Sequence, residues 1–126
     1  MDTVVAEKPT APTVAAKFEN RLKLVGRMTK NKEGAIAISK STARGNMYVS
    51  SRINVPYEKK TEAGSEWRDN IFWFTAWSKV AEAVLKFQDG DMVELNGYIR
   101  ISSFPNKETG KRQYKQEIIA SSVQKV

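Results

Sequence analysis

Aromatic side chains are concentrated in the stretch D-N-I-F-W-F-T-A-W, residues 69–77 of this 126-residue chain. A β-strand sends alternate side chains to opposite faces. Alternation would put Phe72, Phe74 and Ala76 on one face and Ile71, Trp73, Thr75 and Trp77 on the other. One apolar face is enough to build a core. The other face leaves large flat rings without a structural task, and the chemistry that such rings offer is stacking.

Residue types that usually carry catalysis are missing. The chain contains neither cysteine nor histidine, which excludes disulfides, a thiol nucleophile and a Ser-His triad, and removes the commonest general base and metal ligand. A nuclease would need a metal-binding carboxylate cluster, and Asp69, Asp89 and Asp91 fall at strand ends and turns, where carboxylates typically cap. We therefore predict a protein that is not an enzyme, with no cofactor and no metal site.

The charge balance points to a polyanionic partner. The formal net charge is +7, from 21 basic and 14 acidic residues. Charges cancel within residues 1–17, so the excess lies on the body from Phe18 onward. A basic folded body favours nucleic acid over a membrane surface, and a soluble protein that is simply basic is the alternative. Because no apolar run approaches membrane-spanning length and the N-terminus lacks secretory or transit features, we expect a cytoplasmic protein.

One folded domain over residues 18–126 is predicted, preceded by a flexible leader. Residues 1–17 contain two prolines, small residues and no sustained period, and cannot bury much apolar area. Alternation in the body indicates five main strands, at residues 20–28, 46–55, 69–77, 92–103 and 113–123. A short edge strand is expected at 35–39 and a polar loop at 58–68.

Glycines interrupt the first and fourth of these strands. Gly26 predicts a bulge or sharp bend, and Gly97 falls in the middle of residues 92–103. On one side of that fourth strand, alternation places four apolar residues: Val93, Leu95, Ile99 and Ile101. The interruptions favour a small, strongly bent barrel.

A single helical pattern follows the aromatic strand. Val80, Val84 and Phe87 repeat at helical spacing. Ser78 is a candidate N-cap, and the helix is expected to end at D-G-D, residues 89–91. An all-β chain of five strands, with one α-helix between the third and fourth, has the element order of the oligonucleotide/oligosaccharide-binding (OB) barrel.

Four blocks of the chain resemble bacterial-type single-stranded DNA-binding proteins (SSBs), in that family's order and spacing. They are N-R-L-K-L-V-G-R-M (20–28), W-S-K-V-A-E-A-V (77–84), G-D-M-V-E-L-N-G-Y-I-R (90–100) and G-K-R-Q-Y-K-Q-E-I-I (110–119). The resemblance implies an OB-fold that binds single-stranded DNA without sequence specificity and protects it during replication, recombination or repair. It also implies a homotetramer or homodimer, associated with the nucleoid in the cytoplasm.

The resemblance also assigns positions in the site. Trp77 takes the place of a DNA-contacting aromatic at the end of the family's third strand, and Phe104 matches a stacking aromatic at the tip of the fourth. Trp73 falls where the family often has a basic or polar residue that faces DNA. Ile71 falls where the family usually has a stacking tryptophan, which is a departure. Tyr57 is the nearest aromatic to a third stacking position.

Further candidates are aromatics and cations that follow one another on strands and loops. They are Tyr48, Tyr98, Arg52 and Arg100 on strands, Lys59, Lys60, Trp67 and Arg68 in one loop, and Lys107, Lys111 and Arg112 in another. Base stacking on a ring is worth about 1–3 kcal/mol per base, whatever the base, and cations along the same path would hold phosphates. With this role, Phe72, Phe74 and Ala76 should face the core and the rings of Trp73 and Trp77 a surface groove.

Other readings of the same residues stay open. Trp73 and Trp77 could pack under the helix or in a subunit interface, and Trp67 could close a loop cluster. Tyr48 and Tyr98 could stabilise the sheet by cross-strand pairing, and Lys59 and Lys60 could be solvated. A primosome-like accessory factor, an RNA-binding OB-fold protein and a protein-interaction OB barrel are the alternative functions.

The end of the chain departs from the resemblance. Family members commonly end in an acidic, phenylalanine-terminated tip that recruits replication and repair enzymes, whereas this chain ends in S-S-V-Q-K-V. We therefore do not expect recruitment through such a tip. A phage or plasmid form, a specialised paralogue or a truncation would each explain the difference.

Overall fold

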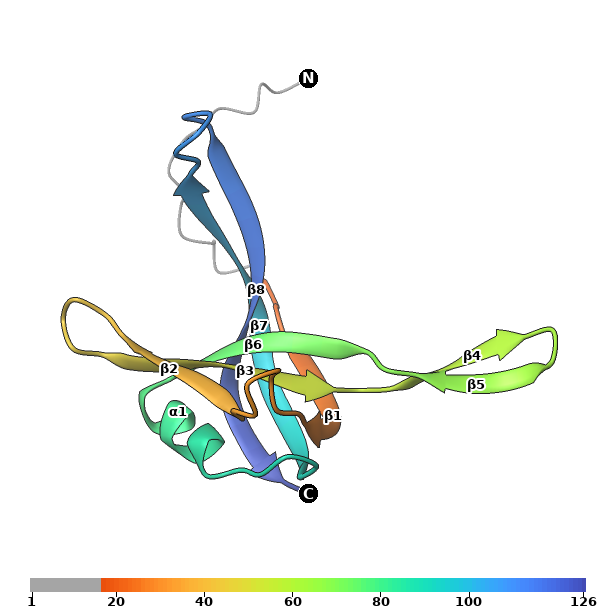
Figure 1. Ribbon diagram of the computed structural model, residues 1–126. Coiled ribbons are helices and arrows are strands. Elements are labelled where there is room, and N and C mark those ends of the chain that lie inside the picture. The colour runs from red at the N-terminus through yellow and green to blue at the C-terminus, as the bar shows by residue number, and fades with distance from the viewer. Residues whose placement is uncertain (1–16) are drawn as a thin grey trace.

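The computed structural model describes residues 17–126 as eight strands and one short helix (Figure 1). The elements in chain order are β1 (Leu22–Met28), β2 (Ala37–Ser41), β3 (Met47–Asn54), β4 (Tyr57–Thr61), β5 (Gly64–Arg68), β6 (Ile71–Trp77), α1 (Ser78–Leu85), β7 (Met92–Pro105) and β8 (Arg112–Lys125). The predicted all-β class with one α-helix is confirmed in its coarser form, since the chain is mostly β with a single helix among residues 17–126. The predicted leader falls on residues 1–16 and Lys17, and residues 1–16 lie outside the described part of the chain.

Six of the strands form one sheet in the order β1-β7-β8-β6-β3-β2, and β1 pairs with β3 as well. Every neighbouring pair is antiparallel except β6 and β8, which run parallel. β2 pairs with β3 alone and forms an edge of the sheet, which confirms the edge strand expected near residues 35–39. β4 and β5 make a separate two-stranded ladder.

The first strand passes from one neighbour to the other at a glycine. β1 pairs with β7 from Leu22 to Arg27, and its last two residues, Arg27 and Met28, pair with Asn54 and Ile53 of β3. A Cβ at Gly26 would lie 2.2 Å from the carbonyl oxygen of Asn54. Only glycine lets the two backbones approach this closely, so Gly26 makes the β1–β3 contact possible.

The core lies between the inward faces of the sheet and the helix. Its largest fully buried side chains are Phe74, Met28, Ile53, Leu95, Val49, Val84 and Val93. Phe74 and Ala76 are buried and Phe72 packs against them, so the predicted inward face of the aromatic strand is confirmed. The helix α1 packs against β3, β6 and β8 and contributes Ala81 and Val84 to this core.

The helix is shorter than expected and begins without its expected cap. It ends at Leu85, because the N–H groups of Lys86 and Phe87 donate to carbonyls three residues back and tighten the last turn. The N-cap position is taken by Trp77, with no side-chain cap, and Ser78 is the first helical residue. The prediction that Ser78 caps the helix is therefore wrong, as is the predicted end at 89–91.

The segment expected to be a polar loop at 58–68 is instead the β4–β5 hairpin. All ten strand residues of this hairpin are exposed. Because it has no buried face, its sequence shows no apolar alternation, and the pattern that identifies strands is missing. This hairpin and the edge strand β2 account for the three strands beyond the predicted five.

The last two strands are longer than the sheet they belong to. β7 and β8 have 14 residues each, and their register shifts between Asn96 and Gly97, where a Cβ would lie 2.0 Å from the carbonyl oxygen of Ile119. Beyond this bulge the hairpin projects away from the sheet (Figure 1). Val93 and Leu95 are buried as their alternation suggests, but Ile99 and Ile101 are exposed because the strands have left the core behind.

Candidate nucleic-acid interface

The outward faces of β3 and β6 form a continuous surface, here called the groove floor. Its residues face one another across the ladder in the pairs Tyr48–Trp77, Ser50–Thr75, Arg52–Trp73 and Asn54–Ile71. The side chains between them, such as Val49, Phe74 and Ala76, are buried on the opposite face. The alternation that builds the core therefore also places the polar and aromatic residues of both strands on one outer surface.

At one end of the floor, Tyr48 and Trp77 support each other. Their ring centroids are 4.6 Å apart and their planes are tilted by 30°. Both rings are partly buried, so each loses little conformational freedom when a further flat group is added. The cross-strand pairing considered for Tyr48 does occur, and it fixes the position of Trp77.

Farther along the floor, Arg52 and Trp73 form a second pair. The Arg52 guanidinium lies over the Trp73 ring, 5.3 Å from its centroid, and donates a hydrogen bond to the backbone carbonyl of Lys30. Trp73 remains 51% exposed and does not pack under the helix. Arg52 therefore contacts both the Trp73 ring and the backbone segment that follows β1.

Part of the floor lines an open groove of about 350 Å³, here called the central groove. The floor residues that line it are Tyr48, Ser50, Thr75 and Trp77. The groove is also lined by Arg100 on β7, by Lys115 and Glu117 on β8, and by Lys40 and Thr42. A smaller adjoining hollow, lined by Trp73, shares Ser50, Thr75, Lys115 and Glu117 with it. Rings and cations thus meet along a single surface path.

Three charged residues of this groove escaped the sequence analysis: Lys40, Lys115 and Glu117. The alternation of the last strand puts Lys115 and Glu117 on one face, opposite Ser102 and Arg100. The alternation of β8 was visible in the sequence. Which residues of β7 lie opposite Lys115 and Glu117 depends on the register of the β7–β8 ladder, which the sequence does not give. No comparable signal marks Lys40, which lies on the short edge strand β2.

Glu117 is the acidic member of the groove. Its carboxylate accepts hydrogen bonds from the Arg100 guanidinium at 3.2 Å and from the Ser102 hydroxyl at 2.9 Å. Burial raises the pKa of Glu117, but the hydrogen bonds from Ser102 and Arg100, together with the positive charges of Arg100 and Lys115, outweigh burial, and the pKa is lowered. The carboxylate is consequently charged at neutral pH and already bound to a groove cation.

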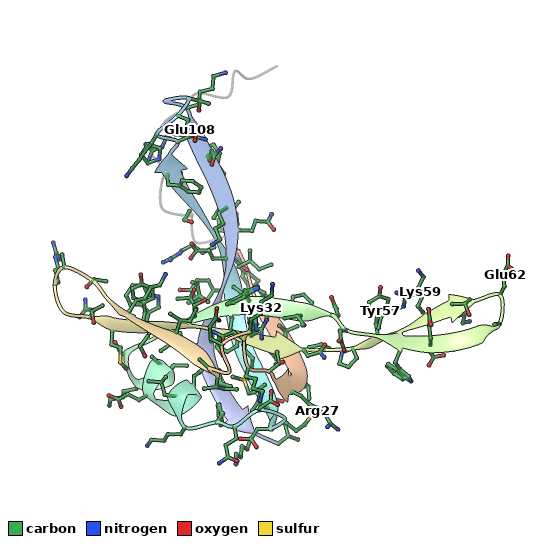
Figure 2. All side chains as sticks on the ribbon, in the orientation of Figure 1. Arg27, Lys32, Tyr57, Lys59, Glu62 and Glu108 are labelled. Carbon is green, nitrogen blue, oxygen red and sulfur yellow. The ribbon has the colours of Figure 1, made fainter. Side chains whose placement is uncertain are left out.

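The β4–β5 hairpin, here called the β4–β5 arm, carries five of the predicted site residues away from the groove: Tyr57, Lys59, Lys60, Trp67 and Arg68. Tyr57 and Lys59 project from one side of the arm into open space (Figure 2). Trp67, which is 69% exposed, pairs with Glu58 and so lies on the face opposite Tyr57. A nucleic-acid strand that lies along one face of the arm can therefore contact only one of the two rings, Tyr57 or Trp67.

The β7–β8 hairpin beyond Gly97, here called the β7–β8 arm, carries another group. Phe104 is exposed and follows Arg100 by four residues on the same face of β7, about 13 Å farther along the strand. Lys107, Lys111 and Arg112 lie at or beside the tip, where Glu108 is also found (Figure 2). Arg112 donates to the Ser103 hydroxyl.

The structure thus divides the predicted site. Tyr48, Trp77 and Arg100 line the central groove, and Arg52 and Trp73 adjoin it. The remaining loop residues lie on the two arms. Tyr98 is elsewhere, in a shallow pocket beside residues 20–23 at the start of β1.

The three aspartates considered as metal ligands serve local hydrogen bonds. Asp69 accepts from the Asn54 side-chain amide at 3.0 Å, Asp89 from the Lys30 N–H at 2.9 Å and Asp91 from the Gln88 N–H at 2.8 Å. Within residues 17–126, no group of three or more acidic residues is placed to hold a metal ion. These carboxylates act as turn and loop caps.

Residues 19–126 match the single-strand binding protein family. The chain belongs to this family. The resemblance based on the four sequence blocks is therefore confirmed, and the match spans all the strands and both arms of this family member. No curated protein matches it by sequence. Within residues 17–126, no helix has the length and apolar character needed to cross a membrane.

Two solved structures share the fold of this family member at low identity. The small single-stranded DNA-binding protein from Streptomyces coelicolor is 18% identical, with a TM-score of 0.56, and the match covers 84% of this chain and 93% of that one. The Plasmodium falciparum SSB in complex with ssDNA is 13% identical, with a TM-score of 0.67, and the match covers 88% of this chain and 97% of that one.

Proposed function

We propose that this protein binds single-stranded DNA without sequence specificity and protects it during replication, recombination or repair. The observation that carries the proposal is the groove floor. There the pairs Tyr48–Trp77 and Arg52–Trp73 lie on the outer face of a sheet whose inner face is buried in the core. Unpaired bases expose flat faces that stack on such rings, and base pairing in a duplex hides those faces. Family membership and the ssDNA complex of the Plasmodium falciparum relative support the same assignment.

Phosphate contacts would come from cations beside the rings. Lys40, Arg100 and Lys115 line the central groove, and Lys107, Lys111 and Arg112 add cations on the β7–β8 arm. The β4–β5 arm carries the cations Lys59, Lys60 and Arg68, but Glu58, Glu62 and Glu66 balance their charge, and Arg68 forms an ion pair with Glu66. A single-stranded chain could enter along the arms by electrostatic attraction and be retained by stacking on the floor. In this mechanism Trp77, Trp73 and Tyr48 retain the DNA strand. Phe104 adds an outer contact, and so does either Tyr57 or Trp67, depending on which face of the β4–β5 arm the DNA follows.

We also infer that β1, β7, β8, β6 and β3 form the five-stranded OB barrel, with α1 at one end. The inference rests on the ring of pairings, since β1 pairs with β7 at one side and with β3 at the other. Residues 18–126 would be the DNA-binding domain, and removal of residues 1–17 should leave affinity nearly unchanged. A large loss on that removal would show that the leader contacts DNA.

A homodimer or homotetramer is the expected assembly. The β7–β8 arm supports this expectation, because Ile99, Ile101 and Tyr114 are exposed apolar residues on the face of the arm opposite Phe104. Light scattering after size exclusion measures the mass directly, and a monomer at micromolar concentration would overturn the expectation. Binding of replication or repair enzymes, and a location at the nucleoid, would follow from the DNA-binding role.

Tryptophan fluorescence tests the proposed function, because all three tryptophans lie on the floor or on the β4–β5 arm. We expect long oligo-dT to quench the emission and high salt to weaken the binding. Duplex DNA added as a competitor should displace little of the bound oligo-dT. A matched RNA homopolymer separates a DNA-binding protein from an RNA-binding one. Absence of both quenching and binding would overturn the proposal and favour a protein-interaction surface.

A further inference from the structure

Glu117 occupies an unusual position for a groove that is proposed to hold a polyanion. Among the described residues that line the central groove, it is the one carboxylate, and Lys40, Arg100 and Lys115 line the same groove. Its side chain is 22% exposed and lies 3.2 Å from the Arg100 guanidinium. The Ser102 hydroxyl holds its other oxygen at 2.9 Å. The carboxylate is thus fixed from two sides, and one of its two partners is a cation of the groove.

A carboxylate and a phosphate offer a guanidinium the same chemistry. Both present charged oxygens that accept charge-assisted hydrogen bonds from arginine. While Glu117 holds Arg100, a phosphate that approaches the groove must either displace the carboxylate or share the guanidinium with it. In both cases the negative charge of Glu117 stays in the groove and repels the strand.

We propose that Glu117 is a built-in competitor of the DNA phosphate for Arg100, which lowers the affinity of the groove and makes the bound strand easier to release. This inference rests on the proposed function, because it concerns the same groove. It assigns Glu117 a role opposite to that of the cations around it. Removing its charge should therefore improve binding, although the substitution breaks an observed ion pair.

The chain provides a matched control in Glu94. Its carboxylate lies on β7, is 23% exposed and forms an ion pair with Lys23 at 3.0 Å. It also accepts hydrogen bonds from Asn96 and Gln124. Glu94 does not line the central groove. Glu117→Gln and Glu94→Gln therefore change the net charge equally and break a similar ion pair, but only the first lies in the groove.

The experiment measures the affinity of the two variants and the wild-type protein for labelled oligo-dT across a salt series. We expect Glu117→Gln to bind about 3- to 10-fold more tightly at low salt, with the slope of log affinity against log salt steeper by about 0.7, the value for one more phosphate contact on a single strand. We expect Glu94→Gln to stay within about twofold of the wild type, because its charge is screened from the groove.

A second background tests whether Arg100 is the shared partner. In Arg100→Gln protein, the added substitution Glu117→Gln should improve binding less than in the wild type, since the guanidinium for which Glu117 competes is gone. Glu117→Thr removes the same charge with a residue suited to a strand, and it should tighten binding too if Glu117→Gln folds poorly. Thermal unfolding of each variant identifies those that are folded.

The outcomes separate this inference from the proposed function. If the wild type does not bind oligo-dT, the proposed function fails. If the wild type binds and folded Glu117→Gln binds equally or more weakly, Glu117 is a positioning residue for Arg100 and the competitor role is overturned. Equal tightening in Glu117→Gln and Glu94→Gln would overturn it as well, because the effect would then come from net charge alone.

Discussion

The groove floor and the β4–β5 arm belong to the same two stretches of chain, since β3 leads into β4 and β5 leads into β6, yet they present their rings differently. On the floor, Tyr48 and Trp77 pack against each other above a buried face. On the arm, both strands are exposed on both faces, and Tyr57 and Trp67 point to opposite sides. The core beneath the floor limits the motion of its rings, whereas the β4–β5 arm has no buried residues beneath Tyr57 and Trp67.

This difference teaches where affinity should come from. A side chain that is free before binding loses conformational entropy when it stacks, at about 0.5–1.5 kcal/mol for each immobilised side chain. A ring that is already fixed keeps most of its stacking energy as affinity. We therefore expect the floor to determine how tightly the strand is held and the arm to determine mainly how fast it is captured.

Replacing Trp77 with leucine should have the largest effect. It removes a stacking platform worth about 1–3 kcal/mol, so affinity for oligo-dT should fall about 5- to 150-fold. Fluorescence anisotropy with labelled oligo-dT measures this loss. Trp67→Leu makes the same chemical change on the arm and should weaken binding much less. Equal losses in the two variants would show that fixing the ring beforehand contributes nothing.

Arg52→Met should have the next largest effect, by a different route. Arg52 holds the Trp73 ring through a cation–π contact and donates to the Lys30 carbonyl, and such a contact is worth about 0.5–2 kcal/mol. We expect an affinity loss of about 2- to 30-fold with little change in the salt dependence, because the guanidinium positions a ring instead of neutralising a phosphate. A salt slope reduced by a full phosphate contact would show that Arg52 binds DNA directly.

On the arm, the double change Lys59→Gln and Lys60→Gln should act mainly on charge. If each lysine neutralises one phosphate, the salt slope falls by about 1.4 in total, at about 0.7 per contact. Association should slow at low salt, and dissociation should change little. Stopped-flow fluorescence separates the two rates. A faster dissociation with unchanged association would place these lysines with the floor residues and contradict the division between capture and retention.

The same contrast explains how far the sequence alone could go. Alternation over 69–77 predicted which residues of β6 are buried, because the period of two is enforced wherever one face meets a core. The β4–β5 arm has no buried face, so its strands left no pattern and were taken for a loop. Arg52 is expected to contact phosphate, and that stays a prediction. Its neighbours within the chain, Trp73 and the Lys30 carbonyl, could not be foreseen, because only the folded arrangement of the strands brings them to it.

The groove residues show the same limit. Glu117, Arg100 and Ser102 come together because β8 pairs with β7 in one register, which a bulge at Gly97 sets. Gly97 was identified as an interruption, but the size and direction of the resulting shift depend on the backbone of β8. The sequence could therefore indicate rings and cations of the right kinds, and it could not determine which of them share a groove.

Acid should weaken the sheet that carries the floor, and this is the smallest effect that we predict. The hydrogen bond from Lys23 lowers the pKa of Glu94, with a further contribution from Asn96, and the pKa of Glu117 is lowered as well. A carboxyl whose pKa is lower in the folded than in the unfolded chain stabilises the fold above its unfolded pKa, near 4.5. That contribution disappears as the pH falls through the lowered value.

The urea concentration at the midpoint of unfolding should therefore be lower at pH 3 than at pH 6. These two pH values lie about 1.5 units either side of the ordinary pKa. Glu94→Gln should flatten this fall, because the ion pair that links β7 to β1 is already absent, and an unchanged pH dependence in that variant would show that acid acts elsewhere in the fold.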